Sequence, residues 1–189
     1  QAAVMDEGWR PHHRRGERHR PSVEPDCGGA AAAGLKQHFD KARPALANAG
    51  LKRACGRVVL VMDGSVEPAG NVLGPLLAAL EDPGVGVCGP FGIVTHDLRS
   101  FEESHGVGLD RRVDAIEGYL MAFRREVIRD IGLFDEKFRW YRTADIECSF
   151  RMKDAGLRAV VVPAPVTRHE HRMYHSTPPA ERDRLSKRN

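Results

Sequence analysis

The sequence lacks the features that would place it in a membrane or a nucleic-acid complex. No apolar run approaches the roughly 18 residues that a membrane-spanning helix requires. The formal net charge of +3 over 189 residues gives no general positive field for nucleic acid, so we expect no nucleic-acid partner. The chain starts at Gln1 without an apolar signal region, and a fragment of a longer protein is one interpretation. Apolar residues make up 41% and charged residues 29%, which is typical of one globular domain with a core.

Cysteine is also scarce. None of the four cysteines forms a C-x-x-C pair, which argues against a zinc knuckle. Cys55, Cys88 and Cys148 lie in apolar stretches, and we interpret them as small core residues. A reduced, cytosolic compartment is the simpler interpretation, although an even number of cysteines leaves a disulfide pair open.

The composition divides the chain into three parts. Residues 1–30 are rich in arginine, histidine and proline, and they hold too little apolar surface to offset the entropy of ordering, so we predict a disordered basic leader. The alternative is an arm for nucleic acid or anionic lipid, but Trp9 is its only aromatic residue and base stacking is poorly supported. A folded domain is expected over 31–175, followed by a charged tail over 176–189.

Within the folded domain, predicted strands alternate with predicted helices. A helix over 31–54 is expected to break near Pro44, and Thr143 is expected to cap the helix over 144–155. The apolar run 57–62 is typical of a strand buried on both faces of a parallel sheet. The remaining predicted strands cover 85–88, 119–123 and 159–162, the remaining helices cover 72–80 and 124–131, and a long loop covers 91–112. This alternation indicates an α/β layered domain.

Three places could carry chemistry. Asp63 follows a buried strand, where open α/β sheets bind ligands, and it could hold a metal ion or a ribose hydroxyl or simply form the Asp63-Gly64 turn. Asp145 could act as a general base, although an acid in the first turn of a helix, Glu147 included, is also favoured by the helix dipole alone. In His169-Glu170-His171, residues two apart face the same way and could reach one metal, although a lone H-x-H is weak evidence and a solvated polar loop is the alternative.

These places fall in the order of motifs found in a known family. From about Ala45 to His171 the chain resembles family 2 glycosyltransferases with the GT-A fold. The stretch 117–127 followed by Gly132-Leu133-Phe134-Asp135-Glu136 resembles the family's strand and "RRE" helix before its "G-x-F-D-E" turn. The segment 144–151 resembles "E-D-x-D-L-x-x-R", and the segment 47–56 resembles the motif that precedes the family's D-x-D strand. The match covers about two thirds of the chain.

The resemblance implies a fold and a set of roles. The fold is a Rossmann-like, three-layer mixed sheet with helices on both faces. Asp145 would be the catalytic base of an inverting transfer. The donor nucleotide-sugar would meet Asp63, Ser65 and Asn48, and a divalent metal, Mg²⁺ or Mn²⁺, would meet Asp63, His169 and His171. The acceptor, a saccharide or a lipid-linked sugar, would meet Trp140, Tyr141, Glu117 and Gly118.

The sequence departs from the family pattern at three points. Ser65 replaces the second Asp of D-x-D, which leaves metal binding weak, shared with Glu67, or dispensable. Ala144 replaces the common Glu beside the base. The family's first nucleotide-binding strand has no counterpart in residues 1–44.

We therefore expect a nucleotide-sugar-dependent transferase of the polysaccharide or glycolipid type. A cytoplasmic location is expected, with peripheral association at the inner face of a membrane as one option. The alternatives are an inactive fragment that retains only nucleotide or sugar binding, and a basic binding protein that acts through residues 10–20.

Overall fold

The structure, a computed structural model, describes residues 43–104, 112–138, 143–169 and 177–187. Its centre is a five-stranded sheet in the order β1-β8-β3-β9-β6. Strand β3 pairs in parallel with β9, whereas β8 runs antiparallel to both β1 and β3, and β6 runs antiparallel to β9. The strands are β1 (Val58–Met62), β3 (Val85–Gly89), β6 (Arg112–Val113), β8 (Leu120–Arg124) and β9 (Arg158–Val161). The sheet is mixed, as the resemblance implies.

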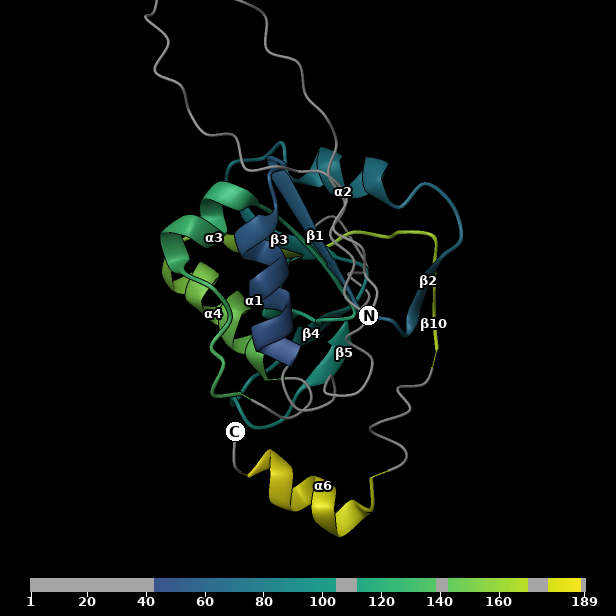
Figure 1. Cartoon of the computed structure of the whole chain (residues 1–189), viewed down its shortest axis with the longest axis vertical. Helices are drawn as coiled ribbons and strands as arrows, with labels where there is room; N and C mark the ends of the chain where they lie inside the picture. Colours follow the sequence, from purple (N-terminus) through teal and green to yellow (C-terminus); the bar gives the residue numbers. More distant parts are fainter. Residues whose placement is uncertain (1–42, 105–111, 139–142, 170–176, 188–189) are drawn as a thin grey trace, which may run out of the picture.

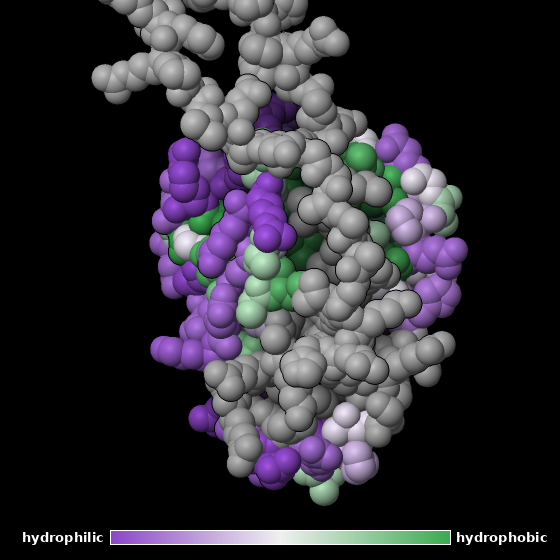
Figure 2. All heavy atoms as spheres, in the orientation of Figure 1, coloured by the Kyte–Doolittle hydropathy of each residue, from purple (hydrophilic) through white to green (hydrophobic). Residues whose placement is uncertain are grey.

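Helices cover both faces of this sheet and complete three layers (Figure 1). Alternate residues of β1 explain the arrangement, because Val59 and Val61 face one core and Leu60 faces the other. The first core holds side chains of α1 (Arg43–Arg53), α3 (Arg125–Ile131) and α4 (Ala144–Asp154), and the second holds those of α2 (Leu73–Ala79). Hydrophilic side chains dominate the α1–α3 side of the surface in Figure 2.

Strand β1 differs from the prediction in the direction of its neighbouring strand. Its burial is as predicted, but its partner β8 is antiparallel rather than parallel. In the described ranges no strand pairs with the outer side of β1. The family's first nucleotide-binding strand is therefore not found in the part of the chain that the structure describes.

Two small sheets correct the prediction for the polar segments. The expected loop 91–112 contains β4 (Gly92–Val94) and β5 (Glu102–Ser104), which form a three-stranded sheet with β7 (Ala115–Ile116). The polar segment after Pro165 contains β10 (Val166–Arg168), paired with β2 (Val66–Pro68). Such short strands form through main-chain pairing across the sequence, so side-chain periodicity does not reveal them. The tail contains α6 (Pro179–Ser186).

Three local expectations also change. Pro44 does not break a helix within the described residues, because it lies in the first turn of α1, where its missing N–H costs no hydrogen bond. Thr143 is at the N-cap of α4, but its hydroxyl makes no capping bond. Cys88 and Cys148 are buried core thiols as predicted, whereas Cys55 is only half-buried, and these three cysteines are free. Residues 1–30 lie outside the described residues, so the leader stays a prediction.

No helix among the described residues is long and apolar enough to cross a membrane.

Candidate functional site

The loops that follow β1, β3 and β9 meet at one edge of the central sheet. The Asp63 N–H donates to the Tyr119 carbonyl (2.9 Å) just before β8, and the Glu117 N–H donates to the Phe91 carbonyl (2.8 Å) just after β3. Val162, after β9, donates its N–H to the Gly89 carbonyl (2.8 Å). In α/β sheets ligands bind in the crevice at this carboxyl edge. The segment Glu117–Tyr119 therefore lies at the centre of the candidate site.

Asp145 is fixed against this segment. It lies in the first turn of α4, is 8% exposed, and its Oδ2 accepts the Gly118 N–H at 2.5 Å. The approach is close, because a Cβ added at Gly118 would lie 3.0 Å from the same Oδ2, and the Asp145 side chain would have to shift to admit it. The Asp145 carboxylate thus lies at the positive end of the helix dipole and accepts the Gly118 N–H. The structure thus brings the predicted base and one predicted acceptor residue into direct contact.

Ser149 anchors the backbone of Asp145 and was missed by the sequence analysis. Its hydroxyl donates to the Asp145 carbonyl (2.9 Å) and accepts the Ile116 N–H (3.2 Å), and the residue is 1% exposed. Residues four apart share one face of a helix, so the spacing of Asp145 and Ser149 is the signal that could have found it.

Asp63 forms a turn with the serine that replaces the second acid. Its Oδ1 accepts both the Ser65 N–H (2.8 Å) and the Ser65 hydroxyl (2.6 Å). The turn interpretation of Asp63 is therefore correct, and the same turn holds its carboxyl group at the carboxyl end of β1.

His169 lies beside this turn. Its N–H donates to the Ser65 carbonyl (2.7 Å), and its Nε2 lies 3.0 Å from Glu67 Oε2. The His169 and Glu67 side chains are 57% and 72% exposed, so their contact contributes little stability. Glu170 and His171 lie outside the described residues, as do Trp140 and Tyr141.

The described residues offer only part of a metal site. Carboxylate and imidazole groups such as those of Asp63, Glu67 and His169 suit Mn²⁺ or Mg²⁺. In the described ranges, however, no group of three or more His, Cys, Asp or Glu residues is arranged to hold a metal ion. A complete coordination shell would require ligands from a bound nucleotide or from other parts of the chain.

Asn48, predicted to bind the donor, has a structural role. The side chain is buried, its amide donates to the Phe134 carbonyl (2.9 Å) and to Glu136 Oε1 (3.0 Å), and it accepts the Phe134 N–H (3.0 Å). These bonds hold the turn over 134–136 against α1. A contact with the donor stays a prediction.

The motif arginine of α4 is structural as well. The Arg151 guanidinium binds Glu147 through Nε (2.5 Å) and Nη2 (3.0 Å) and donates to the carbonyls of Ile131 (2.7 Å) and Leu133 (2.8 Å). It satisfies carbonyls at the end of α3, which otherwise lack helical partners. Glu147 therefore supports Arg151 rather than the crevice.

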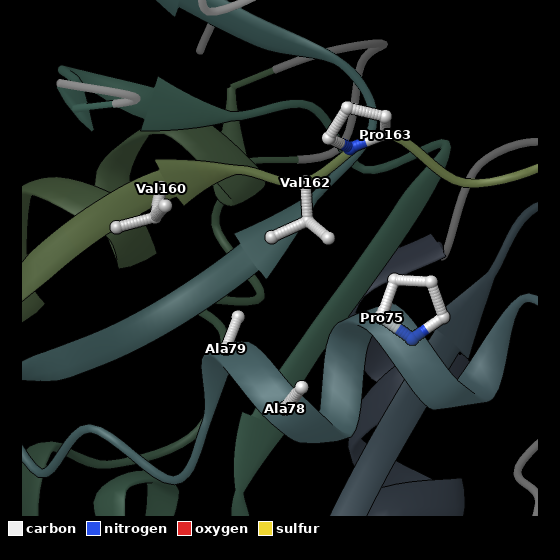
Figure 3. Close-up of a pocket in the computed structure, with 6 residues that line it drawn as sticks. All are labelled: Pro75, Ala78, Ala79, Val160, Val162 and Pro163. Atoms are coloured by element: carbon white, nitrogen blue, oxygen red, sulfur yellow. The ribbon is translucent and has the colours of Figure 1, made fainter. Parts of the chain in front are cut away.

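An apolar recess lies apart from this site, between α2 and β9 (Figure 3). Among the described residues its walls are formed by proline, alanine and valine side chains: Pro75, Ala78, Ala79, Val160, Val162 and Pro163. None of these six side chains is an acid, a base or a metal ligand, so the recess is not where we place the chemistry.

The three layers around a mixed sheet are those of the GT-A fold. The model of the family described as "Glycosyltransferase like family 2" matches residues 32–189, and the chain belongs to that family. A similar solved structure is the crystal structure of GalNAc-T7 with UDP, GalNAc and Mn²⁺, with a TM-score of 0.58 and 17% sequence identity. The similarity covers 69% of this chain and 31% of that one, and at this identity it shows the fold alone. No curated protein matches the sequence.

Proposed function

We propose that the chain transfers a sugar from a nucleotide-diphosphate donor to a hydroxyl acceptor, with Asp145 as the general base and inversion at the anomeric carbon. The observation that supports the proposal most is the placement of Asp145. Its carboxylate is held by Gly118 at the sheet edge where Asp63 and His169 also lie. Family membership supports the general activity.

The chemistry follows from the position of the carboxylate. Asp145 takes the proton of the acceptor hydroxyl while the hydroxyl oxygen attacks the anomeric carbon. The bond from that carbon to the diphosphate oxygen breaks on the opposite face, and the nucleoside diphosphate leaves with the electron pair. The Gly118 N–H keeps the carboxylate oriented toward the acceptor through the reaction.

We propose that the donor lies beside the carboxyl ends of β1 and β10. Asp63, with Ser65 as its turn partner, and His169 are the described residues that would face a diphosphate and its metal, and His171 is proposed to join them. A divalent cation, when bound, would neutralise charge on the leaving diphosphate. The similar structure contains UDP and Mn²⁺, which supports this donor class.

The proposal also covers the acceptor and the place in the cell where the transfer occurs. Trp140 and Tyr141, just before α4, are proposed to stack on a sugar ring of a saccharide or lipid-linked acceptor. A polysaccharide or glycolipid pathway at the cytoplasmic face of a membrane fits such an acceptor.

One observation favours a second candidate, a domain that binds nucleotide but transfers nothing. The Ser65 hydroxyl is bonded to Asp63, so the position that would hold a second acid supplies no carboxylate. Metal-dependent nucleotide binding without release of product would distinguish this candidate from an active enzyme.

Calorimetry of UDP, GDP and dTDP binding, with and without Mn²⁺, tests the donor site. The variant Asp63→Asn removes a carboxylate from the candidate site. Its matched control is Asp97→Asn, which removes a carboxylate from a similar turn elsewhere. In that turn Asp97 Oδ1 accepts the N–H groups of Arg99 (2.8 Å) and Ser100 (2.7 Å). We expect Asp63→Asn to weaken binding of one nucleotide at least about ten-fold and Asp97→Asn to leave it unchanged. Absence of binding in the folded wild-type protein, or equal loss in both variants, would overturn the assignment.

A further inference from the structure

An arginine at the end of β10 contacts three separate segments of the chain, those of Phe91, Glu103 and Glu117–Tyr119. The Arg168 guanidinium carbon lies 5.0 Å from the centre of the Phe91 ring and 5.0 Å from that of Tyr119. The two rings meet edge to face with their centres 5.7 Å apart. Arg168 Nη1 lies 3.4 Å from Glu117 Oε2, and Nη2 lies 3.3 Å from Glu103 Oε1.

Two of these partners flank Gly118, the residue whose N–H binds Asp145. Arg168 contacts the Glu117 carboxylate on one side of Gly118 and the Tyr119 ring on the other. The Glu117 side chain is only 3% exposed, and a buried carboxylate is strongly destabilising when its cation is removed. These two contacts place Arg168 against the residues on both sides of the Gly118 peptide.

The segment that holds Arg168 also links the turn of Asp63 to the segment Glu117–Tyr119. His169 follows Arg168 in the chain and binds the turn of Asp63 through the Ser65 carbonyl. The Tyr119 carbonyl accepts the Asp63 N–H. Movement of β10 would thus be transmitted both to the turn of Asp63 and to the amide that holds Asp145.

We propose that Arg168 is a positioning residue that keeps the Gly118 N–H on the Asp145 carboxylate. A guanidinium suits the role, because it lies over two rings while it contacts two carboxylates, which an ammonium group does less well. The consequence for sugar transfer rests on the proposed function, but the effect on the hydrogen bond does not.

Amide hydrogen exchange of Gly118, followed by NMR without any ligand, tests the proposal. We expect Arg168→Met to accelerate exchange at Gly118 at least about ten-fold, with exchange at Val87 in the centre of β3 unchanged. Arg168→Lys, which keeps the charge, should restore part of the protection. The matched control is Arg129→Met, because Arg129 is 79% exposed and pairs only with its neighbour Asp130 among the ion pairs described.

Unchanged exchange at Gly118 in Arg168→Met would overturn the proposal, and so would equal acceleration at Val87. If Arg168→Met does not fold, the double variant Glu117→Gln with Arg168→Met removes the charge of the buried carboxylate as well. Gly118 must also exchange faster in that variant, and wild-type protection there would overturn the proposal. Since no substrate is used, a failure of the proposed transferase activity would leave this result unaffected.

Discussion

At the scale of single residues, Asp145 is held through both its side chain and its backbone. Gly118 donates to the carboxylate, and Ser149 binds the carbonyl one helical turn from its own position. A general base is effective when it is oriented toward the proton that it accepts. The surrounding bonds supply that orientation before any substrate arrives.

We expect Asp145→Asn to lower the rate of sugar transfer by about 10² to 10⁴, because the amide has nearly the same shape but cannot take a proton. Binding of the nucleoside diphosphate should stay within about a factor of two of the wild-type value. Release of nucleoside diphosphate from a nucleotide-sugar measures the first quantity, and calorimetry measures the second.

Asp154→Asn provides the control, because Asp154 is exposed at the last position of the same helix. A wild-type rate in Asp145→Asn would show that Asp145 is not the base.

The sequence singles out Asp63 and Asp145 because each follows a local signal, the end of a buried strand and the start of a helix, and the resemblance to the family motifs gives each its predicted role. Arg168 has no such signal. Its contact with Glu117 joins positions 51 residues apart, and its contact with the Phe91 ring reaches a second segment, farther away in the sequence. Contacts of that kind exist only once the sheet is assembled, so a single sequence does not reveal them.

At the scale of elements, a strand is predicted correctly where its residues form a continuous apolar run. The central strands β1, β3, β8 and β9 were found from continuous apolar runs. The strands β5 and β10 were missed because they are short and their exposed residues are polar, and β4 was missed because its apolar run is only three residues long. Pairing rather than composition determines those elements.

Asp114 shows how one carboxylate joins several elements. It lies between β6 and β7, and its two oxygens accept the Thr95 N–H (2.8 Å) and the Lys153 Nζ of α4 (2.5 Å). Burial alone would raise the pKa of Asp114, but the bonds from Lys153 and Thr95 outweigh it and hold the pKa below its ordinary value of 3.8. A carboxyl group with a lowered pKa stabilises the fold above its ordinary pKa and loses that effect as the pH falls.

We therefore expect Asp114→Asn to lower the free energy of unfolding by about 1 kcal/mol at pH 7. The difference from wild type should shrink as the pH falls below about 4. Urea unfolding at both pH values measures it, with Asp130→Asn as an exposed control on α3. An equal difference at neutral and acid pH would show that the charge of Asp114 is not the cause.

At the scale of the whole molecule, the two cores share the same strands. Cys88 belongs to the core under α2, and Cys148 to the core under α1, α3 and α4. Burial raises the pKa of each thiol to about 12. Because the thiolate is the reactive form, both thiols should be inert in the native protein at pH 8.

If the two cores unfold as one unit, Cys88 and Cys148 should become reactive at the same urea concentration. Alkylation by iodoacetamide, with each site measured by peptide mass spectrometry, follows the two thiols separately. Half-buried Cys55 serves as the internal comparison and should react at lower urea. Reaction of one core thiol well before the other would show that the layers open independently.

The pairing of β2 with β10 has a consequence for how the molecule assembles. This ribbon has three residue pairs and joins segments about 100 residues apart, as the contact between Glu67 and His169 shows. Closing so long a loop for so few bonds is entropically costly, so the ribbon is expected to form after the central sheet has folded. The turn of Asp63 and the backbone of His169 reach their final places only with that late step. Folding intermediates would then hold a finished core before they hold a finished crevice.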